Sequence, residues 1–187
     1  MRLFAAVTPP SAVVEHLDSF LEVRREAAPL RWVPAEGWHL TLAFMGEADP
    51  WRLDELGERL ERAAGRRTPF EVALAGGGAF PNVARAKVLW AGLDLTSEAR
   101  TELTRLATGA RAAATRSGIE VDGQRFRPHL TLARLGHPGE VSRWVRLLDA
   151  YRGPAWTVET LTLVESHLGE GPRGRPRYEV LGEYPLG

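Results

Sequence analysis

Two short stretches of the sequence repeat nearly the same residues, ninety positions apart. WHLTLAFMG fills residues 38–46 and PHLTLARLG fills residues 128–136, and the two agree at six of nine positions. Two of the five histidines, His39 and His129, occupy the same place in each copy, and a threonine follows two residues later, at Thr41 and Thr131. One histidine with a threonine two residues on is a weak signal. Its duplication with matching neighbours indicates that both copies serve one chemical task.

The side chains of these two HLTL segments suit acid–base chemistry on a phosphate ester. Residues of a strand alternate between its two faces, so His39, Thr41 and Ala43 are expected on one face. The second segment repeats this arrangement. An imidazole with a pKa of about 6.5 serves as a base when neutral and as an acid when protonated. Hydroxyl groups beside it can donate hydrogen bonds to phosphate oxygens. Two such strands facing each other would enclose a cleft that holds an acid and a base, with His129, Thr131 and Ala133 on the second side.

The residue types argue against thiol and metal chemistry. The sequence contains no cysteine, which excludes disulfides, thiolate ligands and cysteine nucleophiles. Neither HLTL segment includes a carboxylate, and no two histidines stand two residues apart as zinc ligands often do. We therefore expect chemistry that needs no metal ion and no other cofactor.

Strand and helix patterns alternate around the two segments. We expect the glycine-rich stretch at 75–86 to be a connection and His167 to lie in a loop. A strand, an HLTL segment, a glycine and a helix occur in this order twice, which predicts one α+β unit of two similar lobes about an approximate twofold axis. Strands are predicted at residues 3–7, 30–33, 39–44, 70–74, 88–93, 130–135, 156–166 and 177–186, and helices at 11–27, 48–67, 96–117 and 140–151.

Length and charge narrow the class of protein. A chain of 187 residues fits one domain. Its 24 basic and 24 acidic residues balance, which argues against a protein that holds long nucleic acid mainly by counterion release but permits a local basic cleft. No apolar run approaches the roughly 18 residues of a membrane span, and the start is too short for a signal peptide. A cytoplasmic protein is expected.

With these segments the chain resembles the two-histidine (2H) phosphoesterases, and among them the LigT-like RNA 2′,3′-cyclic phosphodiesterases, also called 2′-5′ RNA ligases. Besides HLTL at 39 and at 129, RLFAAVTPP is similar to the opening strand of that family, and TLVESHLGEGPRGRPRYEVLGEYPL is similar to its C-terminal strands. The resemblance implies an α+β, bilobal 2H phosphoesterase fold. Two similar lobes of antiparallel-rich sheet, with outer helices, would form a single domain over 1–187 about a pseudo-twofold cleft.

The resemblance also implies roles for individual residues. The reaction would be hydrolysis of an RNA 2′,3′-cyclic phosphate to a 2′-phosphate without metal. His39 would protonate the leaving 3′ oxygen and His129 would activate the attacking water. Thr41 and Thr131 would hold the non-bridging oxygens of the phosphate, and Arg134 would lie near it. The reverse reaction would join a cyclic phosphate to a 5′-hydroxyl through a 2′-5′ bond.

The two HLTL segments differ where Phe44 in the first corresponds to Arg134 in the second. Strict alternation turns both side chains toward the leucine face and makes Phe44 a core residue, whereas a bulge would redirect Arg134 toward the phosphate. An aromatic ring at the edge of the cleft could instead stack on a base. Further possible RNA contacts are Arg31, Trp32 and Arg127.

Three functions remain open at this point. The first is a cyclic phosphodiesterase that acts on RNA 3′ ends, and the second keeps the site but acts on a small cyclic nucleotide such as an ADP-ribose cyclic phosphate. The third is a non-catalytic module that binds RNA ends, which the intact pair of histidines and pair of threonines disfavours. A monomer without membrane partners is expected in each case.

Overall fold

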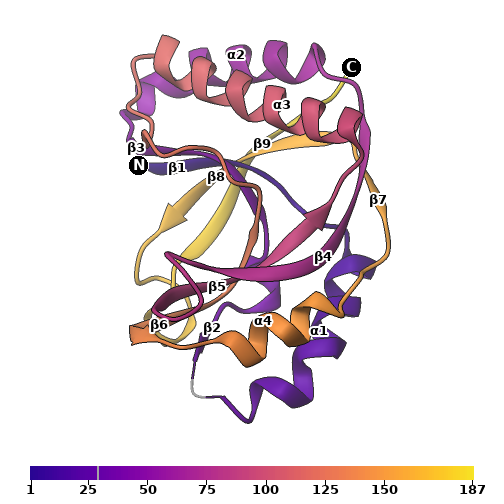
Figure 1. The fold of residues 1–187 in the computed structure, drawn as a ribbon. Helices are drawn as coiled ribbons and strands as arrows, with labels where there is room; N and C mark the ends of the chain where they lie inside the picture. Colours follow the sequence, from indigo (N-terminus) through magenta and orange to yellow (C-terminus); the bar gives the residue numbers. More distant parts are fainter. Residues whose placement is uncertain (29) are drawn as a thin grey trace.

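The computed structural model of the protein describes residues 1–28 and 30–187. Its strands form one antiparallel sheet in the order β7-β4-β5-β6-β3-β1-β8-β9, and β2 pairs with β6 (Figure 1). The strands are β1 (Arg2–Val7), β2 (Arg31–Trp32), β3 (Leu40–Glu47), β4 (Phe70–Phe80), β5 (Ala86–Asp94), β6 (Leu130–Gly139), β7 (Trp156–Val158), β8 (Thr160–His167) and β9 (Arg177–Pro185).

Helices cover the sheet at its two ends. α2 and α3 lie side by side at one end, while α1 and α4 lie at the other (Figure 1). Apolar stripes hold them there, because Leu56 and Leu60 of α2 and Leu103 of α3 are fully buried in the main core. None of the helices in the described residues is long and apolar enough to cross a membrane. The helices are α1 (Ser11–Arg25), α2 (Leu53–Gly65), α3 (Ser97–Arg116) and α4 (Ser142–Asp149), with short 3-10 turns at Ala35–Gly37, Pro50–Arg52 and Pro172–Gly174.

The two HLTL strands, β3 and β6, meet at the centre of the sheet. They are antiparallel, and their one registered pair joins Leu40 to Leu130, the residues that directly follow the two histidines. Both leucines are buried in the main core. A local twofold axis therefore passes between the two segments, as the repeat predicts. The α+β fold of two antiparallel lobes with outer helices is confirmed.

The glycine-rich stretch is strand and not the connection that we expected. β4 continues through Gly76, Gly77 and Gly78 to Phe80 and pairs with β5. The reason is packing: a Cβ on Gly78 would collide with the indole of Trp90, and one on Gly77 would collide with Leu148 of α4. Glycine occurs here because a ring and a helix press against the strand.

Candidate active site

His39 and His129 lie immediately before β3 and β6, and each imidazole is fixed by its own backbone. Nδ1 of His39 lies 2.7 Å from the carbonyl oxygen of Gly37, and Nδ1 of His129 lies 2.6 Å from that of Arg127. A carbonyl oxygen only accepts, so each Nδ1 carries the hydrogen and donates it. In the neutral ring the lone pair is then on Nε2. The two segments thus hold the same tautomer through the same local bond.

Aromatic rings enclose the imidazole of His39. The ring of Phe4, from β1, stacks on it with 4.5 Å between centroids and 24° between planes. Tyr178, from β9, meets it edge-on at 5.5 Å and also contacts Phe4 at 5.2 Å. This packing holds the imidazole in one orientation, because the carbonyl of Gly37 and two rings restrict its rotation.

Aromatic rings also surround His129, but they come from other strands. Phe80, at the end of β4, meets the imidazole edge-on with 4.8 Å between centroids, and Trp90 of β5 lies at 6.0 Å. Trp90 reaches this position because its indole lies over Gly78. The glycine stretch therefore contributes to the site indirectly.

Burial lowers the pKa of both imidazoles below their usual value. For His39, desolvation lowers the pKa most; the bond to Gly37 raises it in part, and the charges of His129 and Arg134 lower it further. For His129, desolvation again lowers the pKa most, the bond to Arg127 opposes this, and Arg134 lowers it. Leu40 and Leu130 face the core, so the preceding histidines lie on the opposite face of the sheet, which we call the histidine face.

The register of β3 and β6 places each threonine opposite the histidine of the other segment. Because Leu40 is opposite Leu130 in an antiparallel pair, His39 is level with Thr131 and His129 is level with Thr41. Thr41 and Thr131 are half-buried, and alternation places them on the same face as the histidines. Each imidazole is thereby accompanied by the hydroxyl of the opposite segment.

A β-bulge interrupts both HLTL strands at the same place. Leu42 is the extra residue of β3 against β1, since Ala6 pairs with Thr41 and Ala5 with Ala43. Leu132 is the extra residue of β6 against β5 in the same way. The expectation that the alanines accompany the histidines is therefore wrong: Ala43 is 2% exposed and lies in the main core with its neighbouring leucine, and Ala133 does the same. A bulge places two consecutive side chains on one face and shifts the alternation that follows.

The bulges turn Phe44 and Arg134 toward the histidine face. Phe44 is 50% exposed and its ring lies 6.0 Å from that of Phe4, so its interpretation as a core residue is wrong. Arg134 is exposed. Burial raises the pKa of the Tyr178 hydroxyl, and the nearby charge of Arg134 lowers it in part. The first segment thus brings an aromatic ring to this face, and the second brings a guanidinium.

The remaining candidate contacts divide between the two faces. Arg31 is the direct cross-strand partner of Arg134, so the two arginines share a face. Trp32 alternates to the opposite face, where it is half-buried against Trp144 of α4 with 4.9 Å between rings, and the structure does not support it as an RNA contact. Arg127 is exposed beside His129, with its guanidinium 5.9 Å from the ring centre of Phe80.

Sequence reasoning missed the aromatic rings around the histidines. Phe4, Phe80, Trp90 and Tyr178 come from β1, β4, β5 and β9, far apart in the chain. Their strands read as ordinary apolar runs, and only the strand order brings them to the site. The run of glycines at 76–78 was the one available signal, because glycine inside a strand indicates close packing.

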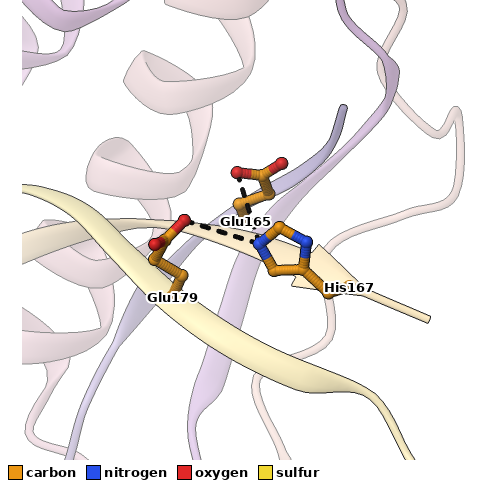
Figure 2. A group of neighbouring side chains, drawn as sticks. All are labelled: Glu165, His167 and Glu179. Carbon is orange, nitrogen blue, oxygen red and sulfur yellow. Dashed lines mark hydrogen bonds and ion pairs between the residues drawn. The ribbon is translucent and has the colours of Figure 1, made fainter. Parts of the chain in front are cut away.

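His167 is the last residue of β8 and not the loop residue that we expected. Its Nε2 lies 3.5 Å from Glu165 and 3.4 Å from Glu179, the two residues paired across β8 and β9 (Figure 2). In the part of the chain that the structure describes, this is the one group whose ligand atoms would suit a metal ion. This group lies on the other face from the histidines, because Glu165 pairs in register with Leu3 of β1, whereas Phe4 beside His39 pairs with Val164. An ion there would not contact a group bound at the histidine face.

Comparison with known proteins connects this geometry to a family. The LigT like phosphoesterase family matches the chain over residues 7–90 and 93–173. The RNA 2′,3′-cyclic phosphodiesterase of Thermus thermophilus is 36% identical over 198 residues, which cover 100% of this chain and 90% of that relative. The RNA 2′,3′-cyclic phosphodiesterase of Geobacillus stearothermophilus is 28% identical over 186 residues. Here 98% of this chain is covered, and the chain spans only 56% of the relative's length.

Solved structures match over nearly the full length. A Thermus thermophilus protein has a TM-score of 0.76 at 31% identity, with 100% of this chain and 98% of the other covered. Escherichia coli LigT complexed with 3′-AMP has a TM-score of 0.75 at 29% identity, with 99% and 97% covered. The arrangement of strands and helices is thus shared with these proteins.

Proposed function

The chain belongs to the LigT like phosphoesterase family, and we propose that it hydrolyses the 2′,3′-cyclic phosphate at RNA ends to a 2′-phosphate. The observation that carries the proposal is the matched pair of imidazoles, each with Nδ1 bound to its own backbone and Nε2 left to act. An acid and a base of one chemical kind, on the same face, are what hydrolysis of a phosphodiester requires.

Proton transfer would run between the two Nε2 atoms. In the neutral imidazole of His129, Nε2 takes a proton from water as the water oxygen bonds to phosphorus. In the protonated imidazole of His39, Nε2 gives its proton to the 3′ oxygen as the bond from phosphorus to that oxygen breaks. The division of roles follows the family, because the hydrogen bonds of the two rings are alike. The 2′ oxygen keeps the phosphate.

The other groups of the histidine face would stabilise charge on phosphorus. Thr41 and Thr131 would each donate a hydrogen bond to a non-bridging oxygen. Arg134 would pair with the charge that grows as water adds, and a guanidinium does this more strongly than a hydroxyl. Arg31 beside it adds a second positive charge, and two arginines paired across strands repel each other until an anion lies between them. Phe44 would offer a ring on which a base can stack.

The same groups would serve a ligation reaction in which a 5′-hydroxyl replaces the attacking water. A 5′-hydroxyl in place of water would give its proton to the base, attack the phosphorus and release the 3′ oxygen. The product would contain a 2′-5′ bond. Ligation of this kind needs no further residue, because a hydroxyl replaces water in the same position.

Small cyclic nucleotides are a second candidate class of substrate. The observation in favour is that the related Escherichia coli LigT is solved in complex with a mononucleotide, 3′-AMP. The ratio of kcat/KM between a cyclic mononucleotide and an RNA with the same terminal nucleotide distinguishes the two classes. A ratio well above one would favour the small substrate.

The proposal is tested with an RNA that ends in a 2′,3′-cyclic phosphate, incubated with the protein in EDTA. We expect turnover and a product whose terminal phosphate is on the 2′ oxygen, identified against 2′- and 3′-phosphate standards. The same RNA with a 3′-phosphate is the control and should not react. A 3′-phosphate product, or turnover that returns only when a divalent ion is added, would contradict the mechanism.

A further inference from the structure

The outer surface of α2 and α3 carries a groove of about 310 Å³ with arginines along its rim. Its floor is made of small residues, among them Ala63 of α2 and Gly109 and Ala112 of α3. A Cβ on Gly109 would lie 3.2 Å from the Cβ of Ala63, so the two helices approach closely here. Long side chains therefore project on both sides of a shallow channel. The arginines of this groove are Arg59, Arg62, Arg66, Arg67, Arg105 and Arg116.

Most of this positive charge has no acidic partner. Arg59 pairs with Glu55 at 2.8 Å, and Arg67 lies 3.6 Å from Glu102. Over residues 1–28 and 30–187, no carboxylate oxygen lies within 4.0 Å of the other four guanidinium groups, all of which are exposed. The protein as a whole has a formal net charge of zero. Four uncompensated charges on one groove are thus a local concentration and not a reflection of a basic protein.

The charges of α2 are ordered along the helix. Asp54, Glu58, Arg62 and Arg66 follow one another at four-residue steps, with the acidic residues toward the N-terminus and the arginines at the C-terminal end. The helix dipole favours this order. The groove therefore adjoins the basic end of α2.

We propose that this arginine groove binds the sugar–phosphate backbone of RNA. Guanidinium groups pair with phosphate through two parallel hydrogen bonds. On the α2 wall, Arg62 and Arg66 stand one helical turn, about 6 Å, apart, and on the α3 wall Arg105 and Arg116 lie about 16 Å apart. Such a row suits a chain of regularly spaced phosphates, whereas a single small anion would neutralise only part of it. The choice of RNA as the polyanion rests on the proposed function.

The groove is separate from the histidine face. α2 and α3 pack on the main core that contains Leu40, whereas Phe4 beside His39 belongs to a distinct small cluster with Ala6 and Val164. An RNA in the groove would thus contact the protein at a second place, away from its cyclic end. Long RNA would gain affinity from this contact, and a mononucleotide would not.

The test replaces Arg62, Arg66, Arg105 and Arg116 together by Gln. The control replaces four exposed arginines outside both sites, Arg24, Arg100, Arg143 and Arg146, by Gln, so that the net charge changes equally. Binding is measured with an RNA of about 30 nucleotides that ends in a 3′-hydroxyl, from low to high salt. We expect the groove variant to bind about tenfold more weakly near 0.1 M salt, with a dependence of log Kd on log salt shallower by roughly 2–3, and the control to resemble the unsubstituted protein.

Kinetics separate this proposal from the proposed function. The groove variant should keep its kcat/KM for 2′,3′-cyclic AMP and lose about tenfold for a long RNA with a cyclic phosphate end. Failure of the unsubstituted protein on 2′,3′-cyclic AMP and on the cyclic RNA would defeat the catalytic proposal, yet the binding experiment would still test the groove. The groove proposal is overturned if the two quadruple variants bind RNA equally, or if the groove variant loses affinity for poly-glutamate as much as for RNA.

Discussion

At the scale of single residues, the two HLTL segments themselves bring one differing side chain to the histidine face. His39 and His129 make the same backbone hydrogen bond and lie level with the threonine of the opposite segment. The difference comes five residues later, where one segment has Phe44 and the other has Arg134. A site with twofold symmetry has no means of distinguishing acid from base. Arg134, in the place of Phe44, gives one half of the site a positive charge that the other half lacks, and this charge acts on both imidazoles.

Replacing Arg134 should therefore affect both turnover and its pH dependence. We expect Arg134→Ala to lower kcat/KM for the cyclic phosphate by about 10²–10³-fold, and Arg134→Lys to lower it less, because the charge remains without the planar fork. Since Arg134 lowers both histidine pKa values, both limbs of the kcat/KM profile should move to higher pH in Arg134→Ala. Unchanged kinetics beside those of an Arg146→Ala control would remove Arg134 from the site.

The burial of His39 should also make stability depend on pH. Its pKa in the folded protein lies below the value of about 6.5 expected in the unfolded chain, so the unfolded chain binds the proton more tightly. The stability that the folded protein gains from keeping His39 neutral is therefore present above pH 6.5. It is lost as the pH falls through the pKa of His39 in the folded protein. We measure the free energy of unfolding by urea denaturation at pH 7.5 and at pH 5. We expect it to fall less over this range in His39→Gln than in the unsubstituted protein. Exposed His137 gives the control, and equal slopes in His39→Gln and His137→Gln would contradict the argument.

At the scale of elements, local sequence patterns predicted where the strands and helices lie, but not where the strands contain bulges. Apolar runs and helix spacing located β3, β6, α2 and α3, because these patterns depend on a single buried face. The positions of the bulges at Leu42 and Leu132 could not be predicted from the sequence, because an extra residue is defined only against a neighbouring strand. Bulge position decides which side chains face the phosphate. The alanines and Phe44 were accordingly placed on the wrong faces.

The glycine stretch of β4 offers a test of how an element supports the site. In Gly78→Ala the new methyl group would collide with the indole of Trp90, which must move away from His129. We expect a lower melting temperature and a lower kcat. Gly65→Ala, at the end of α2 with no atom within 4 Å of the new Cβ, should preserve both. A Gly78→Ala enzyme as active and stable as the Gly65→Ala enzyme would show that the packing of Trp90 does not matter to catalysis.

At the scale of the whole molecule, the repeat predicted the twofold arrangement of the two HLTL strands. The residues that surround each histidine became known only from the strand order. Two equal HLTL segments on strands implied a shared site before any pairing was known. The surroundings of each histidine depend on β1 and β9 on one side and on β4 and β5 on the other. These contacts join residues far apart in sequence, and nothing in the local pattern specifies them. The arginine groove was missed for the same reason, because it forms only where α2 and α3 meet.

The junction of β3 and β6 links stability to activity. Leu130 and Leu106 are both fully buried, and either change to Ala should cost about 2–5 kcal/mol of the free energy of unfolding. Only Leu130 adjoins His129 and pairs with Leu40, so we expect kcat to fall in Leu130→Ala and to remain in Leu106→Ala. We further propose that residues 1–187 unfold as one domain, giving one transition by circular dichroism and by fluorescence. Two transitions, or equal kcat in the two variants, would contradict this.

The central claim is that His39 and His129 act as one acid–base pair. The most direct measurement compares kcat on an RNA 2′,3′-cyclic phosphate for His39→Ala, His129→Ala and the double variant, with melting temperatures to show that all three fold. Each single change should lower kcat by about 10²–10⁴-fold. The double change should lower it little further, because removing either member already disables a unit. Near-normal turnover in either single variant, or a double loss equal to the product of the single losses, would contradict the account.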